Sequence, residues 1–81
     1  MKNSLVFGDA CSNWGRDVFI KNSSKKKSFN VTIDVLLNKV TQPNEIYFVA
    51  AGGKTKIKHC SSPSISDNYD FEILGETEGT V

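Results

Sequence analysis

The stretch SFNVTIDVLLNK, residues 28–39, decides the fold class of this chain. Apolar side chains occupy every second position from Phe29 to Leu37, and polar side chains fill most of the positions between them. Because successive side chains on a strand point to opposite faces, this segment presents one apolar face and one largely polar face. Its β-branched and aromatic residues suit a half-buried strand. We therefore expect residues 28–39 to form the central strand of an all-β domain.

Five further strands are expected around the central one. They span residues 4–7, 17–21, 45–51, 54–60 and 69–74. Turn residues separate these segments roughly every ten residues, and the sequence shows no helical periodicity. The sequence predicts a small antiparallel β-sandwich of immunoglobulin-like appearance with six to seven short strands, and a small β-barrel is the alternative.

The connections on either side of the central strand predict its neighbours. Residues 40–44 are expected to end this strand, because they include a proline. The run that follows, residues 46–51, is continuously apolar, so we expect a strand that is covered on both faces. Residues 22–27 are rich in turn-forming side chains, which predicts a hairpin between residues 17–21 and residues 28–39.

Charge and apolar patterns predict a second hairpin between the last two strands. With the connecting loop centred on Ser64, the opposing pairs are Ile57 with Phe71, Lys58 with Asp70, and Lys56 with Glu72. Directly opposite pairs contribute ~0.2–1 kcal/mol each, and a slip by one residue would lose all of these matches together.

The length of 81 residues predicts a single domain, residues 1–81, in which residues 75–81 form a flexible acidic tail. All Lys and Arg residues lie between Lys2 and Lys58, whereas residues 60–81 hold five acidic residues and no basic one. This asymmetry indicates either charge pairing between strands or a bipolar surface that steers a partner. The first residues, MKNSLVFGDACS, lack the apolar core of a signal peptide, so we expect either a cytoplasmic protein, which is slightly favoured, or one from which a signal was removed. No apolar run approaches the length of a transmembrane helix.

Cys11 and Cys60 are the two cysteines of the chain. A disulfide between them would close a loop of about 50 residues and stabilise the fold by ~4 kcal/mol in the chain-entropy model, whereas a reducing cytosol would keep both thiols free. The one histidine, His59, stands next to Cys60, which suggests a small thiol- or histidine-dependent hydrolase as the weakest alternative. His59 and Cys60 should not contact each other, because neighbouring residues of a strand point to opposite faces. His59, Cys11 and Cys60 also lack the ligand spacing of a zinc site. The sequence therefore predicts a protein that is not an enzyme, with no catalytic residue, metal or cofactor.

Without a catalytic constellation, we expect a protein-binding module that recognises its partner through exposed surfaces. A small inhibitor of a larger enzyme, such as those that phages encode, is one form of this function. The alternative is a weak nucleic-acid-binding protein that uses the lysine-rich turn. The candidate partner-binding residues are Trp14, Lys25, Lys26, Lys27, Leu36, Asp67, Asp70 and Glu72. Leu36 is included because it interrupts the polar face of the central strand. A homodimer through the edge strand at residues 4–7 is a further expectation, and no membrane partner is expected.

Overall fold

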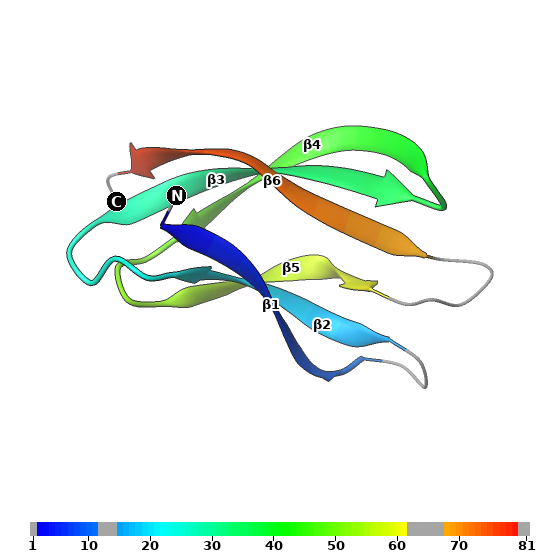
Figure 1. The fold of residues 1–81 in the computed structure, drawn as a ribbon, viewed down its shortest axis with the longest axis horizontal. Helices are drawn as coiled ribbons and strands as arrows, with labels where there is room; N and C mark the ends of the chain where they lie inside the picture. The colour runs from blue at the N-terminus through cyan, green and yellow to red at the C-terminus, as the bar shows by residue number, and fades with distance from the viewer. Residues whose placement is uncertain (1, 12–14, 62–67, 80–81) are drawn as a thin grey trace.

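Six β-strands and no helix make up the part of the chain that the computed structural model describes, which is residues 2–11, 15–61 and 68–79 (Figure 1). The strands are β1 (Asn3–Ala10), β2 (Arg16–Asn22), β3 (Ser28–Leu37), β4 (Val40–Val49), β5 (Lys54–Ser61) and β6 (Tyr69–Gly79). They form two antiparallel three-stranded sheets with the strand orders β1-β2-β5 and β4-β3-β6. The predicted all-β sandwich is confirmed, and the division of these strands into two sheets decides against a closed barrel.

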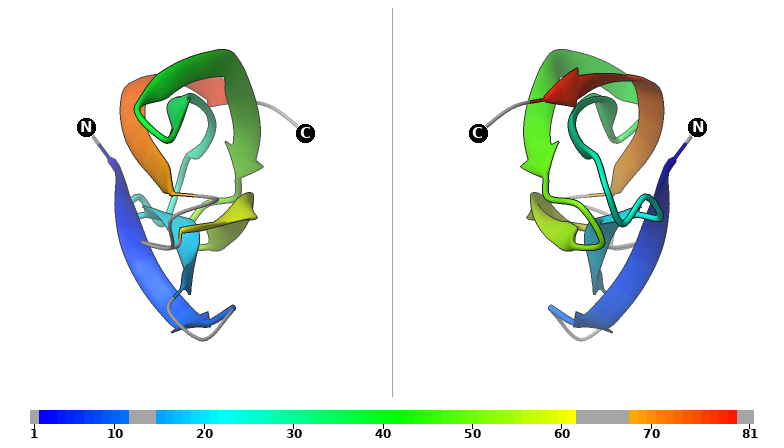
Figure 2. Two further views of the ribbon diagram at one scale, coloured as in Figure 1. Left: turned by 90° about the vertical axis from the view of Figure 1, so that its right-hand side faces the viewer. Right: turned by 90° about the vertical axis from the view of Figure 1, so that its left-hand side faces the viewer.

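The strand neighbours follow the immunoglobulin-like pattern. In that pattern strands A, B and E share one sheet, while strands C and F belong to the other. Here β1, β2 and β5 correspond to strands A, B and E, and β3 and β6 correspond to strands C and F. β4 pairs with the other edge of β3. Figure 2 shows that β1 and β6 lie along one side of the sandwich, and that β4 and β5 lie along the other.

β3 is the central strand of its sheet, as the sequence predicted, because it pairs with β4 on one edge and with β6 on the other. Eight apolar side chains are buried among the described residues, and four of them alternate along β3. The eight are Val18, Ile20, Phe29, Val31, Ile33, Val35, Val49 and Ile57. Val18, Ile20 and Ile57 belong to the opposite sheet. The inner face of β3 is therefore the surface on which the second sheet packs.

A two-residue turn joins β3 directly to β4, so the expectation that residues 40–44 end the central strand is wrong. Asn38 and Lys39 have φ values of 51° and 67°, and positive φ at both central residues is the signature of the type I′ turn of tight hairpins. β4 therefore begins at Val40 and continues through Pro43, which an edge strand tolerates. The sequence did not predict this turn, because lysine seldom adopts a positive φ.

The hairpin expected between the last two strands does not form. β5 pairs with β2, and β6 pairs with β3, so the two strands belong to different sheets. The two β5 lysines of the expected pairs contact other carboxylates. Lys56 Nζ lies 3.6 Å from Asp17 Oδ1, and Lys58 Nζ lies 3.5 Å from Glu45 Oε2. Both arrangements neutralise the same lysines, so the charge pattern alone does not distinguish between them.

The hairpin expected between β2 and β3 is also wrong, because the chain crosses here from one sheet to the other. The buried side chain of Asn22 holds this crossing. Its Nδ2 donates to the Lys27 carbonyl at 2.7 Å and to the Ala50 carbonyl at 3.2 Å, and its Oδ1 accepts from the Ser24 N–H at 2.9 Å. The crossing lets β2 and β3 bury their apolar faces against each other, which two strands side by side in one sheet could not do.

β6 continues to Gly79, so the expected flexible tail over residues 75–81 is wrong for the described part of that segment. The end of β6 pairs with the beginning of β3. The Glu76 carboxylate also accepts hydrogen bonds from the backbone N–H groups of Lys2 and Asn3, both at 3.0 Å. Because the ten-residue β3 supplies a backbone partner along its length, the acidic segment forms a strand despite its charge.

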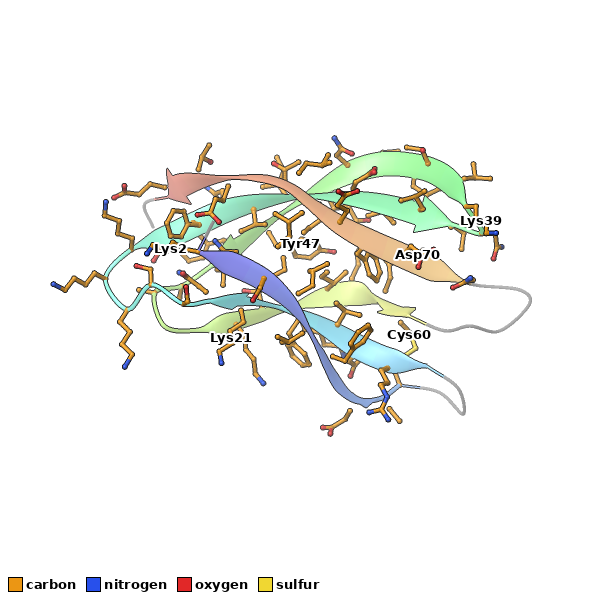
Figure 3. The ribbon with its side chains drawn as sticks, in the orientation of Figure 1. Lys2, Lys21, Lys39, Tyr47, Cys60 and Asp70 are labelled. Carbon is orange, nitrogen blue, oxygen red and sulfur yellow. A yellow bond between two sulfur atoms is a disulfide. The ribbon has the colours of Figure 1, made fainter. Side chains whose placement is uncertain are left out.

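A disulfide joins Cys11, which follows β1, to Cys60 on β5. It connects the two outer strands of the β1-β2-β5 sheet at one end of the sandwich (Figure 3). The two cysteines are 49 positions apart in the sequence, which corresponds to ~4 kcal/mol of stabilisation in the chain-entropy model. Disulfides are typical of oxidising compartments, so the bridge does not favour the expected cytoplasmic location, which stays a prediction.

Candidate functional site

The outer face of the β1-β2-β5 sheet carries three lysines, of which Lys56 pairs with Asp17. Lys21 lies opposite Lys54, and Phe19 lies opposite Lys56, so these four side chains share one face. Lys54 Nζ lies 4.8 Å from the centre of the Phe19 ring, which is a cation–π contact. Lys21 points away from the second sheet (Figure 3). We call Phe19, Lys21, Lys54 and Lys56 the basic face.

The outer face of the β4-β3-β6 sheet carries carboxylates instead. Asp34 on β3 lies opposite Glu72 on β6, and Leu36 lies opposite Asp70. None of the ion pairs between described residues includes Asp34, Asp70 or Glu72. These carboxylates therefore form a block of negative charge that the described part of the chain does not neutralise.

Two exposed apolar side chains share this outer face, on the opposite edge strand and closer to the beginning of β3. Ile46 and Phe48 on β4 are opposite Thr32 and Asn30, so they share the outer face with the carboxylates. Their exposed fractions are 68% and 38%. We call this combined surface the acidic face, and it consists of Asp34, Leu36, Ile46, Phe48, Asp70 and Glu72.

Three of the predicted partner-binding residues come together on the acidic face. Leu36, Asp70 and Glu72 are direct or diagonal neighbours across β3 and β6. Trp14 and Asp67 lie outside the described residues. Leu36, which interrupts the polar face of the central strand, is therefore a half-buried side chain among carboxylates.

The predicted lysine cluster, Lys25, Lys26 and Lys27, lies in the crossing between the sheets, at the opposite end of β3 from Leu36. This crossing packs on the turn between β4 and β5, where the Gly52 N–H donates to the Ser24 carbonyl at 2.7 Å. A hollow of about 380 Å³ lies beside the turn and includes Lys21 and Lys54 in its lining. Within the lysine cluster, Lys27 Nζ lies 3.5 Å from Glu78 Oε2 on β6, so the cluster lies at the end of the sandwich where the chain passes from one sheet to the other.

A second group of polar side chains surrounds Glu45, between the two sheets. Glu45 Oε1 accepts a hydrogen bond from the Tyr47 hydroxyl at 2.5 Å, and its Oε2 lies 2.7 Å from His59 Nε2. Lys58 Nζ lies 3.5 Å from the same Oε2, and the His59 ring stacks on Tyr69 with 4.5 Å between ring centres. Figure 3 shows Tyr47 in the space between the sheets. We call Glu45, Tyr47, Lys58, His59 and Tyr69 the Glu45 cluster.

These contacts determine the protonation of the Glu45 cluster. Partial burial alone would raise the pKa of Glu45, but the hydrogen bonds with Tyr47 and His59, together with the charge of Lys58, hold this pKa below its ordinary value. Burial, together with the hydrogen bond to Glu45, raises the pKa of Tyr47 to about 12. At neutral pH Glu45 is therefore ionised and Tyr47 is a neutral donor.

The Glu45 cluster connects β4 to β5, because Glu45 contacts both Lys58 and His59. A carboxylate that orients a histidine is part of many hydrolytic sites, and a pocket of about 340 Å³ opens beside Glu45 and His59. The Cys60 sulfur, however, is held in the disulfide, so the thiol-hydrolase hypothesis lacks its nucleophile. Within the described ranges, no group of three or more His, Cys, Asp or Glu side chains could hold a metal ion.

The sequence analysis missed Ile46, Phe48, Glu45 and Tyr47 as surface and cluster residues. It interpreted residues 46–51 as a strand covered on both faces. The alternation of Glu45, Tyr47 and Val49 on the inner face and Ile46 and Phe48 on the outer face follows from the register with β3. Counting from Glu45 with a period of two would have separated these two sets.

No family model matches the chain, and neither a curated protein nor a solved structure matches it. None of the described residues belongs to a helix that is long and apolar enough to cross a membrane.

Proposed function

We propose that this protein is a non-enzymatic protein-binding module that contacts its partner through the acidic face. The observation that supports this proposal is the combination of exposed Ile46 and Phe48 with carboxylates that have no ion-pair partner among the described residues. Neighbouring exposed apolar side chains are typical of interaction sites. Uncompensated charge of one sign speeds association with a partner of opposite charge and selects against others.

The chemistry of this face suits a partner surface that combines basic and apolar side chains. Apolar contact with Ile46 and Phe48 would supply most of the affinity for the partner. The carboxylates would orient the partner and raise the rate of association. An inhibitor of a larger enzyme is one form of this function, in which Asp34, Asp70 and Glu72 would imitate phosphate groups of a substrate.

Affinity capture with cross-linking mass spectrometry tests the proposal. The Ile46→Ser/Phe48→Ser double variant should lose the partner that the wild-type protein captures. Val40→Ser is the matched control, because Val40 is an exposed apolar residue of the same strand outside the acidic face, with an exposed fraction of 62%. Equal capture by the double variant, or no cross-link from the acidic face to the partner, would overturn the proposal.

A second candidate function is nucleic-acid binding by the basic face. Its support is the position of Lys21 and Lys54 beside Phe19, which combines phosphate-binding charges with an aromatic ring on which a base could stack. Affinity for a single-stranded oligonucleotide, measured by fluorescence anisotropy, should fall steeply with salt. It should also fall when Lys25, Lys26 and Lys27 are changed together to Ala. No anisotropy change at low salt would exclude this candidate.

A further inference from the structure

The outer edge of β6 has no neighbouring strand in the described part of the chain. The other three edge strands carry features that discourage pairing: lysines along β5, Pro43 in β4, and an irregular register in β1 after Phe7. Between Asp70 and Ile73, β6 keeps a regular register with β3 and holds neither lysine nor proline. This short segment is therefore the edge that is best prepared to accept another strand.

An apolar pocket lies directly beneath this edge, between β6 and β1. Its volume is about 120 Å³, and Leu5, Phe7, Val18 and Phe71 are among the residues that line it. Phe7 lies opposite Val18 on β2, so it belongs to the inward face of its sheet. Val18 is only 3% exposed, whereas Phe7 is 72% exposed. The inner face of the sandwich is thus uncovered along this side.

The opening between β1 and β6 has a defined length. At its other end, the Glu76 carboxylate on β6 bonds the backbone N–H groups of Lys2 and Asn3 and connects the two strands. The open part therefore coincides with the regular, unpaired edge from Asp70 to Ile73.

We infer that this edge binds an extended peptide segment of a partner as an added strand, and that the segment alternates apolar residues with Lys or Arg. Backbone groups of the peptide pair with β6, as in other cases of strand addition. One apolar side chain enters the pocket beside Phe7 and Phe71, because a pocket somewhat smaller than the 150 Å³ that holds a benzene molecule has room for one such group. The basic side chains then lie on the outer face beside Asp70 and Glu72. This inference rests on the proposed function, since it names the class of partner for the acidic face.

Charge argues against a second copy of the chain on this edge. Antiparallel pairing of β6 with β6 of another copy would place Asp70 and Glu72 near the same carboxylates of that copy, and like charges across strands are unfavourable. A basic strand removes this repulsion and neutralises carboxylates that lack an ion-pair partner among the described residues.

Titration of isotopically labelled protein with a synthetic peptide tests the inference by NMR. The probe is acetyl-Lys-Val-Lys-Leu-Lys-Val-Lys-amide, and the control has the same composition in two blocks, acetyl-Lys-Lys-Lys-Lys-Val-Leu-Val-amide. The alternating peptide should shift the amide resonances of residues 70–73 and slow their hydrogen exchange. No shifts at these amides, or equal affinity for the block peptide, would overturn the inference.

N-methylated peptides test the backbone pairing separately. In an added strand, alternate N–H groups face β6 and the others face solvent. Methylation of the second, fourth and sixth nitrogens should therefore change affinity differently from methylation of the third and fifth, with a difference of about tenfold or more from the lost hydrogen bonds. Equal effects of the two methylation patterns would exclude strand addition.

Protein variants separate this inference from the proposed function. Phe7→Ala should weaken binding of the alternating peptide, whereas Val40→Ser, another exposed apolar residue, should not. A Phe7→Ala protein that keeps its other amide resonances and still binds the peptide as wild type would contradict the role of the pocket. If the peptide fails while Ile46→Ser/Phe48→Ser still abolishes capture of a partner, the inference fails and the proposed function stands. If the peptide binds at residues 70–73 and capture does not depend on Ile46 and Phe48, the proposed function fails instead.

Discussion

Replacement of Lys39 by glycine tests the turn that joins β3 to β4. Lys39 has a φ of 67°, where the Cβ of an L-residue crowds the backbone at a cost of ~1–2 kcal/mol. Glycine removes this strain, but its greater freedom in the unfolded chain costs ~0.5–1 kcal/mol. The difference predicts that Lys39→Gly raises the free energy of unfolding by ~0.5–1 kcal/mol. The variant also creates the Asn-Gly pair that type I′ turns prefer.

Urea unfolding followed by circular dichroism measures this change, and an unchanged m-value shows that the variant unfolds as the wild type does. In a domain of this size, ~1 kcal/mol corresponds to ~4–8 °C in Tm, so thermal unfolding gives a second reading. Lys39→Ala is the matched control, because it removes the same side chain and keeps the Cβ. Equal unfolding free energies for the two variants, or a destabilised Lys39→Gly, would refute the assignment of strain to residue 39.

Three further predictions concern the core, the Glu45 cluster and the disulfide. Ile33→Ala, at a fully buried position, should lower the free energy of unfolding by ~2–4 kcal/mol. Leu36→Ala, on the outer face, should lower it by less than ~1 kcal/mol. Urea unfolding measures both changes, and equal losses would contradict the assignment of the two faces. Since the pKa of Glu45 is lower in the folded than in the unfolded chain, its contribution to stability is present above the ordinary value of 4.5 and is lost as the pH falls below it. Glu45→Gln should therefore flatten the decline of Tm in acid, and an unchanged profile would contradict this. Cys60→Ser should lower the free energy of unfolding by ~4 kcal/mol, and a reductant should shift the unfolding midpoint of the wild type but not that of the variant.

The fold converts a charge asymmetry along the sequence into an asymmetry between faces. The lysines of β5 and β2 share one sheet, while Asp70 and Glu72 on β6 belong to the other. Pairing of Lys56 and Lys58 with Asp17 and Glu45 leaves Asp70 and Glu72 without a lysine partner among the described residues, whereas Glu78, also on β6, pairs with Lys27 at 3.5 Å. Charge pairing between strands, the first explanation considered for the asymmetry, is therefore found for Lys56 and Lys58, and a bipolar surface that steers a partner stays a prediction.

The acidic face was predictable in part. Asp70, Glu72 and Leu36 stood out because their alternation within each strand is a local property. That they would become neighbours was not predictable, because it depends on the register between β6 and β3. The exposure of Phe7 was not predictable from the sequence either, because no described strand covers that part of the inner face.

The amino-acid sequence by itself determined the all-β class, the central strand and the apolar face that became the core, because strand formation and alternation are encoded within a few consecutive residues. Only the tertiary structure decided which strands pair. Lys56 is neutralised equally well by Glu72, as expected, or by Asp17, as found, and a cross-strand pair contributes only ~0.2–1 kcal/mol. Burial of the inner faces of β2 and β3 against each other involves several fully buried side chains at ~1.5–3 kcal/mol each, so it outweighs any such pair. Strand pairing, the separation of charge between the two faces and the uncovered edge of β6 all follow from the burial of these apolar faces.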